Sequence, residues 1–489
     1  MEVRATNAAP LETIADTIVV GAFVGEPVAH DLPGEPFELL LRSGEAGQET
    51  GRVALIHAEG RRCVLVGLGR REEFTAQRAR DAAGLSVAKA IELRAQAICW
   101  EVPHHVDETI VAALVEGCVL RSYRFDRYKR ASDTARSPQL SSVVMSAHHD
   151  IEAIVERAAV LATAQNRVRD LGNRPANDLT PAALAEYAHE LAGERAGLEV
   201  IVMDEDMIRD TGMGGFAAVA QGSDQPARLI RLDYNGTPDG PLLALVGKAV
   251  TFDTGGLWLK PKNDMHTMKF DMLGGAAVLE AMATLSDLQA PVRAMGVIGA
   301  TENMISGGAT RPGDIVTALD GTTIEINNTD AEGRLVLGDL ITYSRRTGAA
   351  GIVDIATLTG GVVIALGSVY AGLMSNDDGM AALMQRAGQH TGELVWRLPL
   401  HEAYAEMIKG RYAQITNLTE RREAQPITAA EFLHHFAGDV PWAHVDIAGT
   451  GDNVRSAVIA DKGATGFGLR LLVEAALGWP RVAAAMQAV

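Results

Sequence analysis

From about residue 182 to the C-terminus, short apolar runs alternate with amphipathic stretches, and this alternation constrains the fold more than any other feature. The runs predicted as strands are 242–246, 292–298, 323–326, 352–355 and 444–447. The stretches predicted as helices are 272–285, 335–345, 428–436 and 467–477. Such alternation is typical of a sheet with helices on both faces. We therefore expect a large α/β domain with a central mixed sheet, in which ligand sites lie at the carboxyl ends of strands.

A smaller α/β domain is predicted before it. The chain has 489 residues, and single cores stop growing at about 250–300 residues. Runs 17–23 and 63–68 predict strands, and 74–97 predicts a helix. Apolar residues then recur at helical spacing after Asp150. The predicted divisions are an N-terminal domain over 1–150, a connecting helix and linker over 151–181, and the large domain over 182–489.

Charge and cysteine content limit the partners and the compartment. The net charge of −18, from 44 basic and 62 acidic residues, disfavours nucleic acid and anionic membranes as general partners. Three sparse cysteines suit a reducing compartment. The first residues lack the basic and apolar parts of a signal peptide, and no run reaches the ~18 apolar residues of a membrane span. We expect a cytoplasmic protein.

Two closely spaced carboxylates stand in the run Asn-Asn-Thr-Asp-Ala-Glu-Gly-Arg at residues 327–334. This run reads as a strand entering a tight turn, where Asp330 and Glu332 would point the same way. Two such carboxylates repel unless a cation lies between them. Hard divalent cations prefer carboxylate oxygens. A solvated acidic turn is the alternative for this pair taken alone.

A second group of charges lies in 245–275. Lys248 follows an apolar run, Asp253 precedes a glycine pair, Lys260 precedes a proline, and Asp271 precedes another glycine pair. Each charge stands at the end of a predicted element, where functional residues are often placed. Singly, each has a structural explanation, such as a helix cap. Together with the pair at 330 and 332, they make four carboxylates and two lysines, which is a metal-site composition.

These segments resemble the leucyl aminopeptidase (cytosol aminopeptidase) family of two-metal metallopeptidases. The run Asn-Thr-Asp-Ala-Glu-Gly-Arg-Leu at 328–335 is the family signature. Further matches in order and spacing lie at 247–272, 356–361, 442–449 and 463–472. The resemblance extends from about residue 115 to the C-terminus. Ala249 stands where glycine is usual, and Trp258 stands where a small residue is usual.

The resemblance implies a set of metal ligands. Asp253 and Glu332 would bridge two divalent ions, which in the family are zinc, manganese, magnesium or cobalt. Lys248 and Asp271 would complete the tighter site, and Asp330 the more exchangeable one. A lysine ligand must be neutral, and adjacent dications favour that form. Met268 and residues 357–360 would shape the pocket for the first side chain, whereas His444 and Asp446 are expected to be structural.

The implied activity is an aminopeptidase that releases N-terminal, preferably leucine-like, residues from peptides by attack of a metal-bridging hydroxide. Lys260 would stabilise the oxyanion. Arg334, near a helix N-terminus, would bind bicarbonate as the general base. Family members form homohexamers, and peptides with a free N-terminus are the expected substrates.

Three other functions fit the sequence less well. A P-loop is disfavoured because Ala249 follows Gly247-Lys248 without a hydroxyl, and because no glycine lies five residues earlier. A catalytically silent structural member would have lost ligands, but all five are present, with Lys260 and Arg334. A DNA-binding regulatory member is disfavoured by the net charge of −18.

Overall fold

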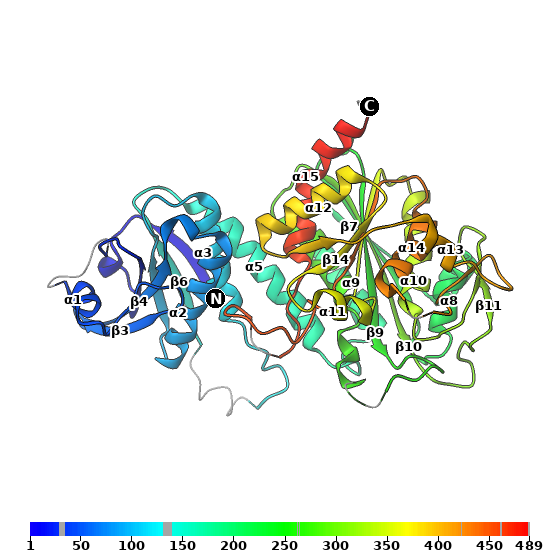
Figure 1. Cartoon of the computed structure of the whole chain (residues 1–489), viewed down its shortest axis with the longest axis horizontal. Coiled ribbons are helices and arrows are strands. Elements are labelled where there is room, and N and C mark those ends of the chain that lie inside the picture. The colour runs from blue at the N-terminus through cyan, green and yellow to red at the C-terminus, as the bar shows by residue number, and fades with distance from the viewer. Residues whose placement is uncertain are drawn as a thin grey trace. The chain divides into compact units, whose positions relative to one another are not determined.

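The computed structural model describes residues 1–28, 35–130, 139–261, 263, 265–421, 423–459 and 462–487. The chain divides into two compact units (Figure 1). Unit 1 comprises residues 1–166 and 455–461, and unit 2 comprises residues 167–454 and 462–489. The domain bounds proposed from the sequence, at 150 and 181, stay predictions. Among the described helices, none is both long and apolar enough to cross a membrane.

Unit 1 contains a six-stranded sheet in the order β1-β6-β5-β2-β4-β3. Its strands are β1 (Glu2–Thr6), β2 (Thr17–Phe23), β3 (Val53–Ala58), β4 (Arg61–Gly69), β5 (Ala97–Glu101) and β6 (Ser142–Ser146). Only β3 pairs antiparallel to its neighbour. Its helices are α1 (Pro36–Ser43), α2 (Ala76–Glu92), α3 (Glu108–Arg121) and the first part of α5 (Glu152–Asn173).

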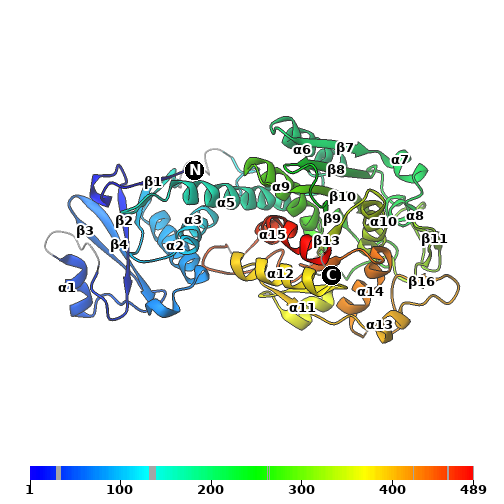
Figure 2. The ribbon, with the colours of Figure 1, turned by 90° about the horizontal axis from the view of Figure 1, so that it is seen from above.

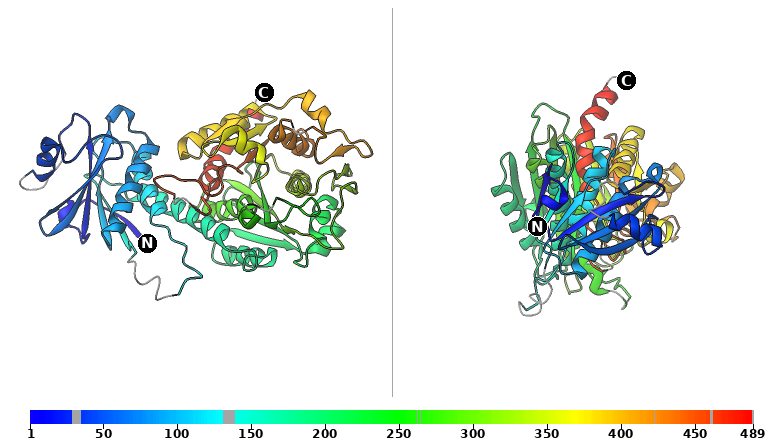
Figure 3. Two further views of the ribbon diagram at one scale, coloured as in Figure 1. Left: turned by 60° about the horizontal axis from the view of Figure 1, so that its bottom comes forward. Right: turned by 90° about the vertical axis from the view of Figure 1, so that its left-hand side faces the viewer.

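Alternation along β2 shows how both faces of this sheet are buried. Ile18 and Val20 pack with Phe37 of α1 in one apolar cluster. Val19 packs in another cluster with residues of α2 and α3. In the left panel of Figure 3 the blue strands accordingly lie between helices on two sides. Successive side chains of a strand point to opposite faces, so the predicted α/β character of this region is confirmed.

Unit 2 contains an eight-stranded mixed sheet in the order β15-β14-β17-β13-β9-β10-β8-β7 and a small sheet β11-β12-β16. The large sheet consists of β7 (Leu198–Met203), β8 (Arg228–Asn235), β9 (Leu243–Asp253), β10 (Arg293–Asn303), β13 (Gly351–Ala356), β14 (Ala371–Ser375), β15 (Val395–Arg397) and β17 (Trp442–Asp446). The small sheet consists of β11 (Ile315–Thr317), β12 (Thr323–Glu325) and β16 (Ile415–Thr416). Strands β17, β13, β9 and β10 are mutually parallel.

Helices cover both faces of the large sheet, as the sequence predicted. They are α6 (Pro181–Gly193), α7 (Glu205–Asp210), α8 (Gly214–Ala220), α9 (Leu273–Asp287), α10 (Glu332–Arg346), α11 (Gly360–Leu366), α12 (Asp378–Thr391), α13 (Glu402–Met407), α14 (Gln425–Ala437) and α15 (Leu469–Gln487). In Figure 2, α9 and α15 lie on one side of β9 and β13, and α10 lies on the other.

Glycines allow the close approach of α9 to the sheet. A Cβ on Gly247 of β9 would lie 2.6 Å from Cα of Gly275 in α9. A Cβ on Gly299 of β10 would instead lie 2.5 Å from a methyl group of Val336 in α10. Gly247 therefore faces α9, and alternation turns its neighbour Lys248 toward α10.

Candidate metal centre

Lys248 lies inside β9 rather than after it. The strand extends to Asp253 because it pairs with β10 as far as Asn303, whereas its pairing with β13 stops at Gly247. The sequence had placed the end of this strand at residue 246. Lys248 is 2% exposed, and its Nζ lies 2.8 Å from Oδ2 of Asp271 and 2.7 Å from Oε1 of Glu332.

Asp253 ends β9, and a glycine turn follows it. Gly255 and Gly256 have φ of +85° and +62°, which is the left-handed region that favours glycine. Gly255 N donates to Oδ1 of Asp253 at 2.8 Å, and Nδ2 of Asn303 donates to the same oxygen at 2.8 Å. The turn brings Lys260 back, so that its Nζ lies 2.6 Å from Oδ2 of Asp253.

Asp330 and Glu332 converge, but by a different route from the one predicted. The expectation of a strand in which both point the same way is wrong, because β12 ends at Glu325 and α10 begins at Glu332. Asp330 lies in the connecting turn, where its N–H donates to Oδ1 of Asn328 at 2.7 Å. Oδ1 of Asp330 lies 2.5 Å from Nζ of Lys260.

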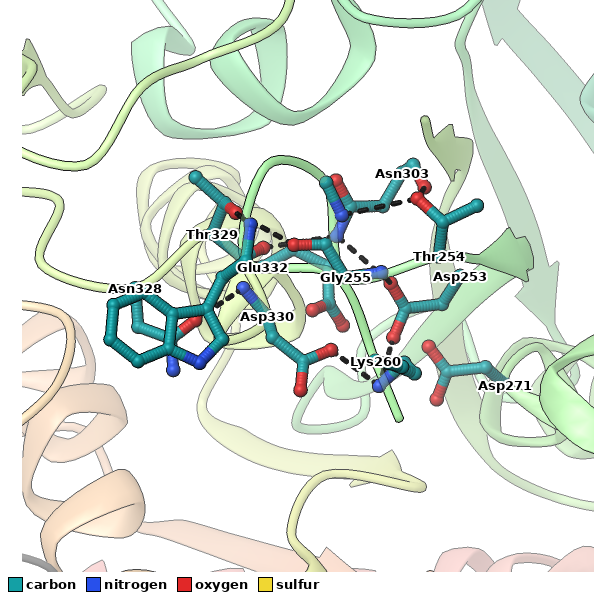
Figure 4. A network of polar contacts seen from close by, with 12 residues as sticks. Asp253, Thr254, Gly255, Lys260, Asp271, Asn303, Asn328, Thr329, Asp330 and Glu332 are labelled. Atoms are coloured by element: carbon teal, nitrogen blue, oxygen red, sulfur yellow. Dashed lines mark hydrogen bonds and ion pairs between the residues drawn. The ribbon is translucent and has the colours of Figure 1, made fainter. Parts of the chain in front are cut away.

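The site therefore assembles all four carboxylates and both lysines that the sequence indicated. Figure 4 shows Asp253, Asp271 and Asp330 with their carboxyl groups turned toward the amine of Lys260. Asp271 lies after the 3₁₀ helix at Met265–Phe270, and its Oδ1 accepts a hydrogen bond from Oγ1 of Thr357 at 2.7 Å. Carboxylate oxygens of Asp253, Asp330 and Glu332 all lie within 4.8 Å of one another.

Burial and mutual repulsion perturb these groups strongly. Burial, with the charge of Glu332, raises the pKa values of Asp253 and Asp330. Burial alone would lower the pKa of Lys248, but Asp271 and Glu332 outweigh it and raise that pKa. Burial would raise the pKa of Glu332, but the two lysines outweigh it and lower that pKa. Four carboxylates against two ammonium groups leave an excess of negative charge that favours a cation.

The donor set fits divalent metal ions. Carboxylate oxygens are the ligands that hard dications prefer, and a neutral lysine amine adds one nitrogen. Oε2 of Glu332 is buried, and within the described residues it has no hydrogen-bond partner. Gly333 also keeps the space next to Lys248 open, since a Cβ there would lie 2.7 Å from Nζ. These residues together could hold divalent metal.

Arg334 occupies the first turn of α10 and is 5% exposed. Its Nη1 donates to the carbonyl oxygen of Asn417 at 2.8 Å, and its Nε is buried without a hydrogen-bond partner in the described structure. Burial lowers the pKa of this arginine to about 10, although Glu332 and Asp446 oppose the change. A buried guanidinium with a free N–H near a helix N-terminus suits a small anion.

Asn417 is a residue of the site that the sequence did not reveal. Its Oδ1 accepts from the N–H of Asn327 at 2.9 Å, and its Nδ2 donates to the carbonyl oxygen of Asn328 at 2.7 Å. It follows the two-residue strand β16 and is fully buried. A single asparagine about 90 residues from the signature carries no sequence signal beyond its polarity, so only the fold identifies this clamp.

The remaining predicted residues support the site from outside. Oδ2 of Asp446 accepts from Oγ1 of Thr359 at 2.6 Å, which fixes the segment after β13. Nδ1 of His444 lies 2.5 Å from Oδ1 of Asp354, which also accepts at Oδ2 from the indole of Trp442. Met268 is half-buried in the 3₁₀ helix before Asp271. The structural roles predicted for His444 and Asp446 agree with these contacts.

Comparison with known proteins gives matches over nearly the whole chain. The Cytosol aminopeptidase family, catalytic domain, matches residues 166–473, and the N-terminal domain of the same family matches residues 31–132. A probable cytosol aminopeptidase of Roseiflexus castenholzii is 41% identical over 98% of this chain and 99% of that relative. The cytosol aminopeptidase of Pseudomonas aeruginosa is 41% identical over 91% of each chain.

Solved structures give the same result. The bottromycin maturation enzyme BotP in complex with Mn superposes with a TM-score of 0.86 and 35% identity, covering 95% of this chain and all of that one. A mutant of tomato leucine aminopeptidase superposes with a TM-score of 0.87 and 31% identity, covering 98% of this chain and 96% of that one.

Proposed function

This chain belongs to the cytosol aminopeptidase family, and we propose that the six charged side chains around Lys248 and Lys260 form its catalytic centre. The protein is an aminopeptidase that depends on divalent metal ions. The proposed substrates are peptides with a free N-terminus, with leucine-like first residues preferred. The observation that carries the proposal is the buried amine of Lys248 between Asp271 and Glu332, at 2.8 and 2.7 Å.

Each ligand has a proposed place. Asp253 and Glu332 would bridge two metal ions, Lys248 and Asp271 would complete one site, and Asp330 the other. Asn303 and Thr357 would orient two of these carboxylates through the hydrogen bonds described above. When bound, two such ions would activate a water molecule and polarise the scissile carbonyl.

Two basic side chains would then act on the substrate. Lys260 is an ammonium held by Asp253 and Asp330. Burial would lower its pKa, but the neighbouring carboxylates outweigh burial and raise the pKa. It would therefore carry positive charge to the developing oxyanion. Arg334 would bind bicarbonate through its buried Nε–H, and that anion would accept and return the proton during peptide-bond hydrolysis.

The decisive experiment measures hydrolysis of leucine-p-nitroanilide by the metal-stripped protein and by the same protein after Mn²⁺ or Zn²⁺ is restored. Restored activity on the free amine, with none on the N-acetylated substrate, would establish a metal-dependent aminopeptidase. Inactivity with every divalent metal, in a folded protein, would refute the proposed centre. Arg334→Ala tests bicarbonate separately: the rate should fall and lose its dependence on added bicarbonate.

Assembly and location are further proposals. We propose a homohexamer in the cytoplasm, because the relatives are named cytosol aminopeptidases and because the family resemblance implies that assembly. Light scattering on the purified protein tests the assembly. A hexamer of 51.8 kDa chains should give a molar mass about six times that of one chain. Fractionation of the producing cells tests the location.

A further inference from the structure

A cavity of about 710 Å³ opens in unit 2 next to the metal centre. Trp258 and Asn327 line one part of it, and the segment from Lys409 to Arg421 lines another. Trp258 precedes Lys260 by two residues. Its backbone N–H donates to Oγ1 of Thr329, the residue before Asp330, at 2.8 Å. Pockets for small ligands are typically about 300–1,000 Å³, so this cavity has room for a short peptide segment.

Two aromatic side chains of this cavity are exposed. Trp258 is 44% exposed and Tyr412 is 72% exposed. Both line the cavity, and the family resemblance gives a small residue at the position of Trp258. An indole is a large, rigid and amphipathic contact surface. Its exposure beside the catalytic lysine suits packing against part of a substrate.

The same cavity carries cationic side chains, although the whole chain has a net charge of −18. Lys409, Arg411 and Arg421 line it, with Glu325 and Glu420 as the acidic members. The carboxylate of Glu325 accepts hydrogen bonds from the backbone N–H groups of Arg411 and Tyr412, each at 3.0 Å. Glu325 therefore holds the backbone at these two residues in place. Lys409 pairs with Glu406 at 2.6 Å.

Two arginines are therefore available for a ligand. The guanidinium of Arg411 lies 5.3 Å from the ring centroid of Tyr412. Within the parts of the chain that the structure describes, neither Arg411 nor Arg421 forms an ion pair. A guanidinium binds a carboxylate through two parallel hydrogen bonds. A peptide that ends in a free carboxylate would supply that partner.

We propose that this cavity receives the part of the substrate after the scissile bond and selects short peptides. Trp258 packs on the residue that follows the bond, and Arg411 and Arg421 bind the C-terminal carboxylate. This inference rests on the proposed function, because only an aminopeptidase centre at Lys260 and Asp330 makes the neighbouring cavity the leaving-group side. It adds a substrate class, namely peptides of two or three residues, to that function.

The test compares Leu-Gly-Gly with its C-terminal amide, using Mn²⁺-loaded enzyme. We expect the wild-type kcat/KM to be about tenfold higher for the acid than for the amide, because one well-formed charged contact contributes about that factor. In the double variant Arg411→Gln/Arg421→Gln, the ratio of acid to amide should fall to about one. Because the readout is a ratio within each variant, a general loss of activity cancels.

Matched controls separate charge from fold. Arg311→Gln removes an exposed arginine of the same unit that pairs with Asp314 at 3.1 Å, and it should keep the wild-type ratio. Arg411→Lys/Arg421→Lys should keep part of it. Trp258→Ser should lower kcat/KM for Leu-Phe more than for Leu-Gly, because only the larger residue packs on the indole.

The outcomes distinguish this inference from the proposed function. Equal kcat/KM for acid and amide in the wild type, or an unchanged ratio in the double glutamine variant, would overturn the subsite while leaving the aminopeptidase intact. Failure of the wild type to cleave leucine-p-nitroanilide with any divalent metal would overturn both.

Discussion

At the scale of single residues, the absence of one side chain shapes the metal centre. Gly333 has no Cβ, and a Cβ at this position would lie 2.7 Å from Nζ of Lys248, which is too close without displacing that side chain. We predict that Gly333→Ala displaces the amine of Lys248 and weakens metal binding by about 10–100-fold, as lost ligand positioning does. Metal titration by calorimetry measures this, with circular dichroism as the check on folding.

Gly193→Ala is the matched control, because nothing lies within 4 Å of a Cβ at that position in α6. It should bind metal as the wild type does. Unchanged metal affinity in Gly333→Ala would contradict the claim that Lys248 needs this space to be a ligand.

Asn417 gives a second prediction at this scale. Its side chain joins β16 to the turn that carries Asp330, through Asn327 and Asn328. We predict that Asn417→Ala lowers kcat/KM about 10–100-fold and destabilises the protein by about 1–3 kcal/mol, because buried backbone groups lose their partners. Kinetics and denaturant unfolding measure the two effects.

Asn376→Ala serves as its comparison, because Asn376 also bonds backbone groups, at 2.8 and 3.0 Å, but lies outside the site. It should lose stability without a comparable loss of kcat/KM. Equal kinetic losses in the two variants would show that Asn417 acts only through general stability.

The sequence identified site residues that stand within contiguous motifs, and missed those that do not. Asp253, Asp330 and Glu332 are recognisable because each follows a predicted strand or precedes a glycine turn. Asn303 and Asn417 contact the same centre, yet each is a single amide whose partners lie 26 to 90 residues away in the sequence. Hydrogen bonds across such separations depend on the folded arrangement of strands, which no local pattern contains.

At the scale of secondary-structure elements, Asp339 of α10 connects three segments. Its carboxylate accepts from the N–H of Phe216 at 2.9 Å and from that of Leu319 at 2.7 Å. It thereby caps α8, whose own N-cap residue, Met213, offers no side-chain hydrogen bond. Burial raises the pKa of Asp339 to about 7 from its ordinary value of 3.8, although these N–H groups oppose the change.

This shift predicts a specific pH dependence of stability. The folded state holds the proton more tightly than the unfolded state, so the stabilisation is fully present below pH 3.8 and is lost as the pH rises through about 7. The difference in the free energy of unfolding between wild type and Asp339→Asn should therefore fall by about 3 kcal/mol between pH 4 and 7, at about 1.4 kcal/mol per pKa unit. Urea unfolding across this range measures it, and a constant difference would show that Asp339 is ionised in the fold.

The elements themselves were predicted well where burial is uniform. Strand β2 has the predicted bounds, and α9 and α10 lie within a few residues of theirs. The far half of β9 was missed because it carries Lys248 and Asp253, and charged residues do not look like a buried strand. Only pairing with β10 keeps this half extended, so the error fell on the residues that form the site.

At the scale of the whole molecule, the three cysteines all lie in one of the two units. Cys63, Cys99 and Cys118 are all free, buried and part of unit 1. Burial raises the pKa of each thiol, to about 11 for Cys99. Since the thiolate is the reactive form, we predict that the native protein reacts negligibly with a thiol-specific chromogenic disulfide at pH 8, whereas the denatured protein releases three equivalents.

Labelling during denaturation should therefore report the opening of unit 1 alone. Tryptophan emission of a variant keeping only Trp442, which lies in unit 2, would report the other unit. Rapid labelling of any thiol in the native protein, before either unit unfolds, would contradict the burial of these side chains.

Local sequence patterns could not predict which segments make up unit 1. Residues 455–461 belong to it although about 290 residues of unit 2 intervene. Val458 and Ile459 join its apolar core, and a Cβ on Gly84 of α2 would lie 2.6 Å from the carbonyl oxygen of Ala457. This irregular segment has no periodicity, so its burial depends on the finished fold.

That late segment sets an order of events during translation. Residues 1–166 leave the ribosome first, and the two apolar side chains at 458 and 459 follow only after about 290 further residues have been made. Domains generally fold as units during synthesis, at about 5–20 residues per second. The nascent N-terminal unit would therefore wait roughly 15–60 s at that speed with part of its apolar surface uncovered, and it is during this interval that the growing polypeptide has most need of a chaperone.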